Sequence, residues 1–288
     1  MKEVLRIEQL THVYGPGTPF EKTAVDRVDF SALHGEFIAL IGHTGSGKST
    51  LIQHFNGLLR PTAGRVLING EDIYQTKEMT RAARFAVGLV FQYPEYQLFE
   101  ETVYADVAFG PKNMGLEKAE IDRRVRENCR ITGIPEELLE KSPFELSGGQ
   151  KRRVALAGIF AMEPEVLVLD EPMAGLDPAG CEDVFRFIRE YHQKHGTTII
   201  FVTHSMEYAA LLAQRIVVMD HGRILMDGTP QQIFSRSEEL LRAGLDVPQV
   251  TRVFLELKKR GVPVDPAVYT VSQAAEALRR LKGGKCQC

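Results

Sequence analysis

The chain alternates between short, continuously apolar runs and longer segments whose apolar residues recur every three or four positions. The short runs carry no polar face, which is typical of parallel strands buried on both sides, whereas the longer segments are typical of amphipathic helices. This alternation predicts an α/β fold in which helices cover both faces of a parallel sheet. The runs are Phe37–Ile41, Val87–Gln92, Val166–Leu169 and Thr197–Thr203.

Polar side chains suited to catalysis follow these predicted strands. Gln92 ends one run, Asp170 and Glu171 follow another, and His204 follows a third. Ligands of parallel sheets bind at the carboxyl ends of the strands. Together with the glycine-rich loop that follows Ile41, these residues predict a site at one edge of the sheet.

Two further strands are predicted before the glycine-rich loop, where Val4–Tyr14 and Ala24–Phe30 read as extended segments. We expect them to form an antiparallel side sheet over the ligand. A strand over Arg65–Gly70 closes on Asn-Gly, which indicates a hairpin.

Helical patterns dominate two other parts of the chain. Residues from about 93 to 160 predict a helical subdomain, with helices over Val103–Phe109 and Glu117–Thr132 and a loop over Gly110–Gly115. The main domain is expected to span residues 1–230, and residues 231–288 a small C-terminal helical domain. Its expected helices are Gln231–Leu241, Pro248–Lys259 and Val271–Leu281, and its expected capping boxes begin at Ser235 and Thr270.

The loop after the first apolar run carries the clearest chemical signal. It matches G-x-x-x-x-G-K-[ST], the Walker A phosphate loop, between a predicted strand and a predicted helix over Leu51–Leu59. Its glycines let successive N–H groups turn towards phosphate oxygens, and the helix start adds a positive dipole end. Lys48 is expected to bind the β- and γ-phosphates of ATP, and the Ser49 hydroxyl to bind Mg²⁺. The predicted ATP-binding residues are Gly42, His43, Thr44, Gly45, Ser46, Gly47, Lys48, Ser49 and Thr50.

Composition narrows the class of protein. The formal net charge of −3 gives no sign of a nucleic-acid-binding surface. We expect no signal peptide, and no apolar run approaches the about 20 residues that span a bilayer. Any role at a membrane is therefore expected to act through another chain. The four cysteines lack metal-ligand spacing and are interpreted as reduced thiols.

From residue 4 to about 230 the chain resembles the ATP-binding-cassette (ABC) ATPases. The resemblance rests on the Walker loop, on Asp170-Glu171 and on a signature segment made of Leu146, Ser147, Gly148, Gly149 and Gln150. It implies that Tyr14 stacks on adenine, that Gln92 touches Mg²⁺ and the attacking water, and that Asp170 holds the Mg²⁺ shell. It also implies that Glu171 is the catalytic carboxylate, that His204 contacts the γ-phosphate and that Asp177 lies at a subunit interface.

Structural alternatives stand beside these roles. Tyr14 also fits an ordinary surface-strand tyrosine, and His204 a hydrogen-bonded core histidine. The signature segment also fits a helix N-cap. In the family, this segment binds the γ-phosphate held by a partner's Walker loop. Because the chain has one of each, the resemblance implies a head-to-tail dimer with two ATP molecules between the subunits.

A narrower resemblance, to the ATPases of energy-coupling-factor (ECF) importers, lies in Val90–Phe99, in Phe109–Asn113 and in the helical tail. It implies a peripheral protein on the cytoplasmic face of the cell membrane that powers uptake of vitamins or metal ions. The implied partners are a paralogous ATPase, a transmembrane coupling protein and a substrate-capturing membrane subunit, with a homodimer possible for the chain alone. The segment after Gln92 would line the groove for the coupling protein, with core packing as the alternative.

Three other functions occur among ABC ATPases, and the sequence argues against two of them. A DNA-repair ATPase would insert a long coiled coil between Lys48 and Leu146, yet that stretch has no sustained heptads. A translation-type factor would carry two cassettes, and this chain has one. A conventional importer that works with a solute-binding protein has the same ATPase chemistry and stays open.

Overall fold

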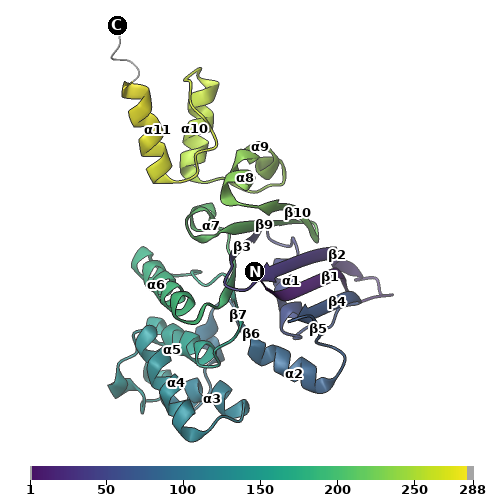
Figure 1. The fold of residues 1–288 in the computed structure, drawn as a ribbon, viewed down its shortest axis with the longest axis vertical. Coiled ribbons are helices and arrows are strands. Elements are labelled where there is room, and N and C mark those ends of the chain that lie inside the picture. Colours follow the sequence, from purple (N-terminus) through teal and green to yellow (C-terminus); the bar gives the residue numbers. More distant parts are fainter. Residues whose placement is uncertain (1, 284–288) are drawn as a thin grey trace. The chain divides into compact units, whose positions relative to one another are not determined.

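The computed structural model describes residues 2–283, which form eleven α-helices, ten strands and three short 3₁₀ helices. The chain divides into two compact units: residues 1–36 with 49–202, and residues 37–48 with 203–288. We call them the first and the second unit. Figure 1 gives the order of the elements along the chain.

The first unit contains seven strands and most of the helices. Its strands are β1 (Glu3–Tyr14), β2 (Lys22–Leu33), β4 (Ala63–Ile68), β5 (Glu71–Asp72), β6 (Val87–Val90), β7 (Val166–Asp170) and β8 (Thr198–Val202). Its helices are α1 (Lys48–Phe55, whose first residue belongs to the second unit), α2 (Lys77–Ala86), α3 (Val103–Asn113), α4 (Lys118–Ile131), α5 (Gly148–Phe160) and α6 (Pro178–His195), with the short η1 (Pro94–Gln97), η2 (Glu136–Leu138) and η3 (Pro143–Glu145).

An antiparallel sheet forms the N-terminal part of the first unit, with strand order β2-β1-β4-β5 (Figure 1). The predicted hairpin after β4 is confirmed, because Ile68 pairs with Glu71 across a two-residue turn. Asn69 and Gly70 both have left-handed φ angles, 52° and 87°, as a type I′ turn requires.

Three parallel strands form the other sheet segment of this unit. β7 pairs on one side with β6 and on the other with β8, and every residue of all three strands is buried. Continuous apolar strands of this kind are stable only where both faces are covered. The predicted α/β class, with a parallel sheet and an antiparallel side sheet, is therefore confirmed.

The helical segment has a core of its own. α3, α4 and α5 pack against one another, and their buried side chains include Val107, Val125 and Val154 (Figure 1). Two helices, α3 and α1, end four residues away from the predicted position. α3 continues through the expected loop to Asn113 and contains Pro111, which is buried there although it lacks the N–H that would bond to the Val107 carbonyl. α1 ends at Phe55, before the predicted Leu59, because the chain turns at Gly57 with φ of 71°.

The second unit begins with β3 (Phe37–Gly42), which pairs in parallel with β9 (Arg215–Asp220). The strand β10 (Arg223–Gly228) pairs antiparallel with β9. Its helices are α7 (Met206–Leu212), α8 (Pro230–Ser235), α9 (Ser237–Arg242), α10 (Gln249–Lys259) and α11 (Val271–Gly283).

The helical tail confirms one predicted cap and corrects the other. The Thr270 hydroxyl accepts from the Gln273 N–H at 3.3 Å, and the Gln273 side chain accepts from the Thr270 N–H. The box predicted at Ser235 is wrong, because the chain forms its capping box six residues earlier, at Thr229 and Gln232. Ser235 ends α8, where its hydroxyl donates to the Gln232 carbonyl, so the helix predicted over Gln231–Leu241 is two helices.

Candidate functional site

The phosphate loop follows β3 in the second unit. Gly45 and Gly47 have φ angles of 84° and 103°, which side-chain-bearing residues rarely adopt, so the loop curls as its motif predicts. The Lys48 ammonium is buried and donates to the carbonyls of Gly42 at 2.7 Å and His43 at 3.0 Å. These contacts hold a positive charge within a loop of backbone amides, which is the chemistry that binds phosphate.

Position 42 requires glycine because of close packing, not because of its φ angle. A Cβ at this position would lie 2.5 Å from the Met219 carbonyl oxygen of β9 and 2.5 Å from the Ser46 hydroxyl oxygen. The neighbouring hairpin also supports the loop, because the Gly222 N–H donates to the Ser46 carbonyl at 2.9 Å. His204, also in this unit, is exposed in the segment before α7.

Tyr14 ends β1 in the first unit. Its side chain is 43% exposed, and its hydroxyl lies 3.3 Å from the Thr50 Oγ1 of α1. The ring of His12 packs against the Tyr14 ring with centroids 4.5 Å apart. The Tyr14 ring is thus exposed but held by contacts with Thr50 and His12. It lies next to the first turn of α1, where Ser49 is also exposed.

The polar residues at the carboxyl ends of β6 and β7 come together as predicted. The Gln92 amide nitrogen lies 3.5 Å from the Glu171 carboxylate, at the long limit of a hydrogen bond. Asp170 is the last residue of β7 and is buried, whereas Gln92 is exposed. An amide and two carboxylates therefore share one strand edge within this unit.

The backbone is strained just after β6 and just after β7. Tyr93, directly after Gln92, has φ of 58°, and Glu171 has φ of 48°. Neither residue type favours the left-handed region, and such conformations cluster at functional sites. The Glu171 N–H donates to the Val202 carbonyl at 3.1 Å, which helps to hold this conformation.

The signature segment forms the N-terminus of α5. Ser147 and Gln150 make a reciprocal capping box, with the Gln150 N–H 3.3 Å from the Ser147 hydroxyl oxygen. Leu146 is buried, while Gly148 and Gly149 are exposed, and no atom lies within 4 Å of where a Cβ on either glycine would be. The signature segment therefore does cap α5. The cap leaves the positive N-terminal end of the helix open beside the two glycines.

Asp177 has a structural role in the chain itself. It is exposed and caps α6, with its carboxylate accepting from the Gly180 N–H at 2.7 Å. A carboxylate at a helix N-terminus is stabilising on its own.

Sequence reasoning missed one buried charge next to these segments. Arg152 on α5 is 3% exposed, and its guanidinium donates to the Glu95 carboxylate at 3.1 Å and to the Ala174 carbonyl at 3.0 Å. It therefore joins the signature helix to η1 after Gln92 and to the turn after Glu171. The sequence marks Arg152 only by its place on the face of α5 that also carries Leu156 and Phe160. Its partners Glu95 and Ala174 lie far away in sequence, so they could not be predicted.

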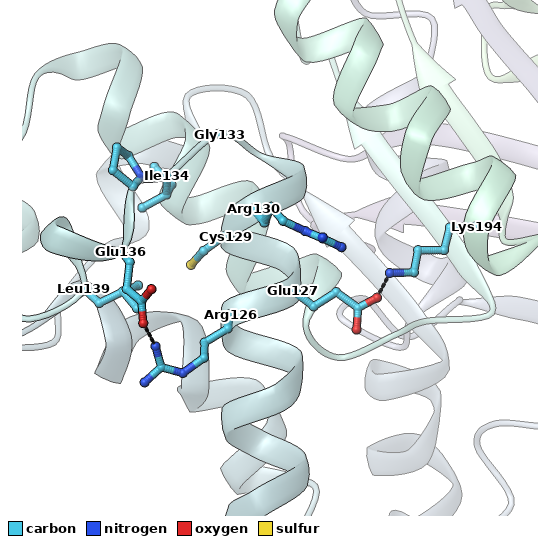
Figure 2. Close-up of a pocket in the computed structure, with 10 residues that line it drawn as sticks. Arg126, Glu127, Cys129, Arg130, Gly133, Ile134, Glu136, Leu139 and Lys194 are labelled. Carbon is cyan, nitrogen blue, oxygen red and sulfur yellow. Dashed lines mark hydrogen bonds and ion pairs between the residues drawn. The ribbon is translucent and has the colours of Figure 1, made fainter.

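A cavity of about 740 Å³ lies elsewhere in the first unit, beside α4 and α6 (Figure 2). Its charged residues largely pair with one another, as in the Arg126–Glu136 and Glu127–Lys194 ion pairs. Burial raises the pKa of the Cys129 thiol to about 12, so this cysteine is unreactive at neutral pH. None of the predicted site residues lines this cavity, and its own residues offer no catalytic arrangement.

The sequence profile described as ABC transporter matches residues 25–174. A curated relative from Caldanaerobacter subterraneus subsp. tengcongensis, described as energy-coupling factor transporter ATP-binding protein EcfA2, is 52% identical over 282 residues, covering 98% of this chain and 99% of that protein. A relative of the same description from Clostridioides difficile is 48% identical over 284 residues, with 98% and 99% covered.

Solved structures agree with the sequence relatives. The structure of cbiO1 from Clostridium perfringens, described as part of the ABC transporter complex cbiONQ, matches with a TM-score of 0.74 at 38% identity, covering 91% of this chain and 98% of that one. A dimeric post-hydrolysis structure of the cassette MJ0796 bound to ADP and Pi matches with a TM-score of 0.69 at 27% identity, covering 78% and 98%. Within residues 2–283, no helix has both the length and the apolar character needed to cross a membrane.

Proposed function

The chain belongs to the ABC transporter ATPases, in the branch of the energy-coupling-factor ATP-binding proteins, and from this premise we propose how its residues work. It converts ATP and water to ADP and phosphate, and it uses that reaction to drive import through a membrane coupling protein and a substrate-capturing subunit. The observation that carries the residue assignment is the meeting of Gln92 and Glu171 beside Asp170.

ATP binding is assigned to two sets of residues. The loop from Gly42 to Thr50 binds the phosphates, with Lys48 supplying charge at the β- and γ-phosphates. Tyr14 stacks on adenine, because its ring is exposed while its hydroxyl is anchored at Thr50. A ring fixed in this way loses little freedom when a base stacks on it.

The oxygen donors of Ser49, Gln92 and Asp170 fit Mg²⁺, which prefers hard oxygen ligands and accepts only one or two carboxylates. All three belong to the first unit, with Gln92 and Asp170 at neighbouring strand ends. When bound, Mg²⁺ neutralises charge on the β- and γ-phosphates.

Hydrolysis needs a positioned water more than covalent chemistry. Glu171 is assigned to orient that water and to accept its proton, and the Gln92 amide to hold the carboxylate in place. The left-handed backbone at Glu171 sets the direction of its side chain. His204 is assigned to the γ-phosphate, as an exposed imidazole able to donate a hydrogen bond.

A second chain completes each site in this proposal. The open N-terminus of α5, with Ser147 and two exposed glycines, offers N–H groups to a γ-phosphate held by another subunit's phosphate loop. Asp177 lies at the subunit interface. Residues 1–230 form the ATP-binding domain, and residues 231–288 help to join the chain to a paralogous ATPase as a heterodimer.

We propose that an apolar groove of about 290 Å³ in the first unit receives the membrane coupling protein. In this proposal the chain works at the cytoplasmic face of the membrane. Phe99 and Phe109 stack edge to face on it, with centroids 4.8 Å apart, and are 57% and 43% exposed. Exposed aromatic pairs beside an apolar groove are typical of sites that receive an amphipathic helix. Other residues of the groove are Leu98, Val154, Gly158, Ile159 and Met162.

Purification from native membranes tests the partners. The chain is captured from detergent-solubilised membranes, and the proteins that accompany it are identified by mass spectrometry. A second ATPase with a polytopic membrane protein and small membrane subunits supports the proposal. Two copies of one permease with a solute-binding protein would instead assign the chain to a conventional importer, with its ATPase chemistry unchanged.

Phosphate release tests the chemistry. We expect Lys48→Ala to reduce ATP hydrolysis to background, because it removes the charge that binds the β- and γ-phosphates. Lys118→Ala removes an exposed lysine from the start of α4 and serves as the matched control. Wild-type turnover in Lys48→Ala would show that the loop has been misassigned.

A further inference from the structure

Three potential metal ligands meet in the second unit, on the side of the phosphate loop that faces the β9–β10 hairpin. The His43 Nε2 lies 2.9 Å from the Asp220 Oδ1, and the His221 Nε2 lies 3.7 Å from the same oxygen. The ligand atoms of all three residues lie within 4.8 Å of one another. His43 and Asp220 are partly buried, and His221 is exposed.

The contacts of His43 turn one ring nitrogen to the backbone and the other to the Asp220 carboxylate. Its Nδ1 lies 2.8 Å from the Thr44 carbonyl oxygen, which only accepts, so Nδ1 carries the hydrogen. The other ring nitrogen, Nε2, faces the Asp220 Oδ1 at 2.9 Å, so an imidazole nitrogen and a carboxylate oxygen lie side by side at this point. Metal-binding histidines commonly donate their other N–H to a backbone carbonyl in this way.

The turn between β9 and β10 supplies the other two ligands. Asp220 pairs with Arg223 across a two-residue turn in which His221 and Gly222 have φ angles of 44° and 76°. This is a type I′ turn, and histidine is among the few residues that tolerate its left-handed first position. The turn holds the His221 ring 5.3 Å from the His43 ring, measured between centroids.

We propose that His43, Asp220 and His221 bind a divalent transition-metal ion of the Zn²⁺ class. Two imidazoles and one carboxylate suit Zn²⁺, whereas Mg²⁺ and Ca²⁺ prefer oxygen ligands throughout. Ligand atoms around a tetrahedral Zn²⁺ lie about 3.3 Å apart. The His43–Asp220 contact of 2.9 Å would have to lengthen slightly and the His221–Asp220 contact of 3.7 Å to shorten, and the exposed His221 side chain has room to turn. Three protein ligands leave a fourth position for water.

A metal ion here would tie the phosphate loop to the hairpin. The Gly222 N–H already donates to the Ser46 carbonyl at 2.9 Å, so loop and hairpin are joined on both sides of the site. Inhibition of ATP turnover by micromolar Zn²⁺ is therefore expected, and this consequence rests on the proposed function. Binding of the metal does not depend on it.

Calorimetric titration with ZnCl₂ tests the site directly. The protein is the full chain without added histidine tags, carrying Cys286→Ser and Cys288→Ser so that two thiols outside the described residues do not compete for the metal. We expect one Zn²⁺ per chain, and a loss of affinity of at least about tenfold in His221→Gln and in Asp220→Asn. His34→Gln, which removes an exposed histidine of the first unit, is the matched control.

Nitrogen-15 spectra of the histidine rings identify the ligands independently of activity. The proposal expects Zn²⁺ to shift the Nε2 signal of His43 and to leave that of His34 in place. Equal affinity in wild type, His221→Gln and Asp220→Asn would overturn it, as would a His43 signal that responds to protons and not to Zn²⁺. If Zn²⁺ binds as expected but the wild-type protein does not hydrolyse ATP, the metal site stands and the proposed function fails.

Discussion

The Nε2 of His54 lies 3.1 Å from the Nδ1 of His12, and both side chains are buried between β1 and α1. The His54 Nδ1 donates to the Thr50 carbonyl at 2.7 Å, so its Nε2 is the acceptor and His12 the donor. Tyr14 packs on the same His12 ring. His12 thus contacts both His54 and the side chain assigned to adenine.

This pair predicts a loss of stability in mild acid. Burial, with the nearby His12, lowers the pKa of His54 to about 4. Because the unfolded chain binds this proton near pH 6.5 and the folded chain does not, the free energy of unfolding is full above pH 6.5 and falls as the pH drops towards 4. The loss amounts to at most about 3.5 kcal/mol, because the pKa of this imidazole falls from 6.5 to about 4 on folding and a tenfold change in proton affinity is worth about 1.36 kcal/mol.

Urea unfolding across this pH range checks the loss. His54→Gln should flatten the pH dependence, while His34→Gln, at an exposed position, should leave it as in wild type. A flat profile in the wild-type protein would show that His54 titrates normally.

The buried ion pair of Arg152 predicts a large effect at a distance from the nucleotide. Arg152→Met leaves the Glu95 carboxylate and the Ala174 carbonyl without their donor, so we expect the free energy of unfolding to fall by about 3 kcal/mol. Arg130→Met, which removes an exposed arginine from α4, should change it by less than about 0.5 kcal/mol. Equal unfolding midpoints in the two variants, measured in urea, would contradict the assigned role.

The packing of Gly42 predicts that even one methyl group disturbs the phosphate loop. Gly42→Ala places its Cβ 2.5 Å from the Met219 carbonyl oxygen, so β3 and β9 must separate or the loop must move. We expect a loss of about 1–3 kcal/mol in stability and a marked loss of ATP affinity, measured with a fluorescent ATP analogue. Gly158→Ala in α5 is the control, because its Cβ meets nothing closer than 3.7 Å and helix propensity favours alanine.

The sequence predicted the buried parallel strands well, because continuous apolar runs such as Val166–Leu169 identify them. The strand predicted over Val87–Gln92 ends at Val90, so Gln92 lies two residues beyond β6. The Asn69-Gly70 turn followed from local chemistry alone. The Walker loop likewise follows from a short, contiguous motif.

What the sequence did not reveal depends on contacts between distant segments. His12 meets His54, and Arg152 meets Glu95, only after the chain folds, so no local pattern marks either pair. The left-handed backbone at Glu171 is imposed by its surroundings against the residue's own preference. Gly110 and Pro111 predicted a loop, yet both lie within α3, where the Pro111 side chain is buried by tertiary packing.

The proposed role of Glu171 predicts an arrested dimer. Glu171→Gln keeps the hydrogen-bonding shape next to Gln92 but removes the group that accepts the proton of water. ATP should then bind without turnover and hold two subunits together, which light scattering after size exclusion in Mg-ATP measures. The wild-type protein, which turns ATP over, is the control. A monomer in Mg-ATP, even with the partner ATPase present, would contradict the sandwich arrangement.

The exposed aromatic pair of the groove predicts a defect in assembly that leaves the fold intact. Phe99 is 57% exposed, so Phe99→Ser removes little buried surface, and the free energy of unfolding should change by less than about 1 kcal/mol. The same change removes the apolar edge that the groove offers to a helix of the coupling protein, so co-purification of that protein from membranes should fall at least about tenfold. Phe20→Ser is the matched control, because Phe20 is 87% exposed in the loop between β1 and β2. Equal recovery of the coupling protein with both variants would move its docking site away from this groove.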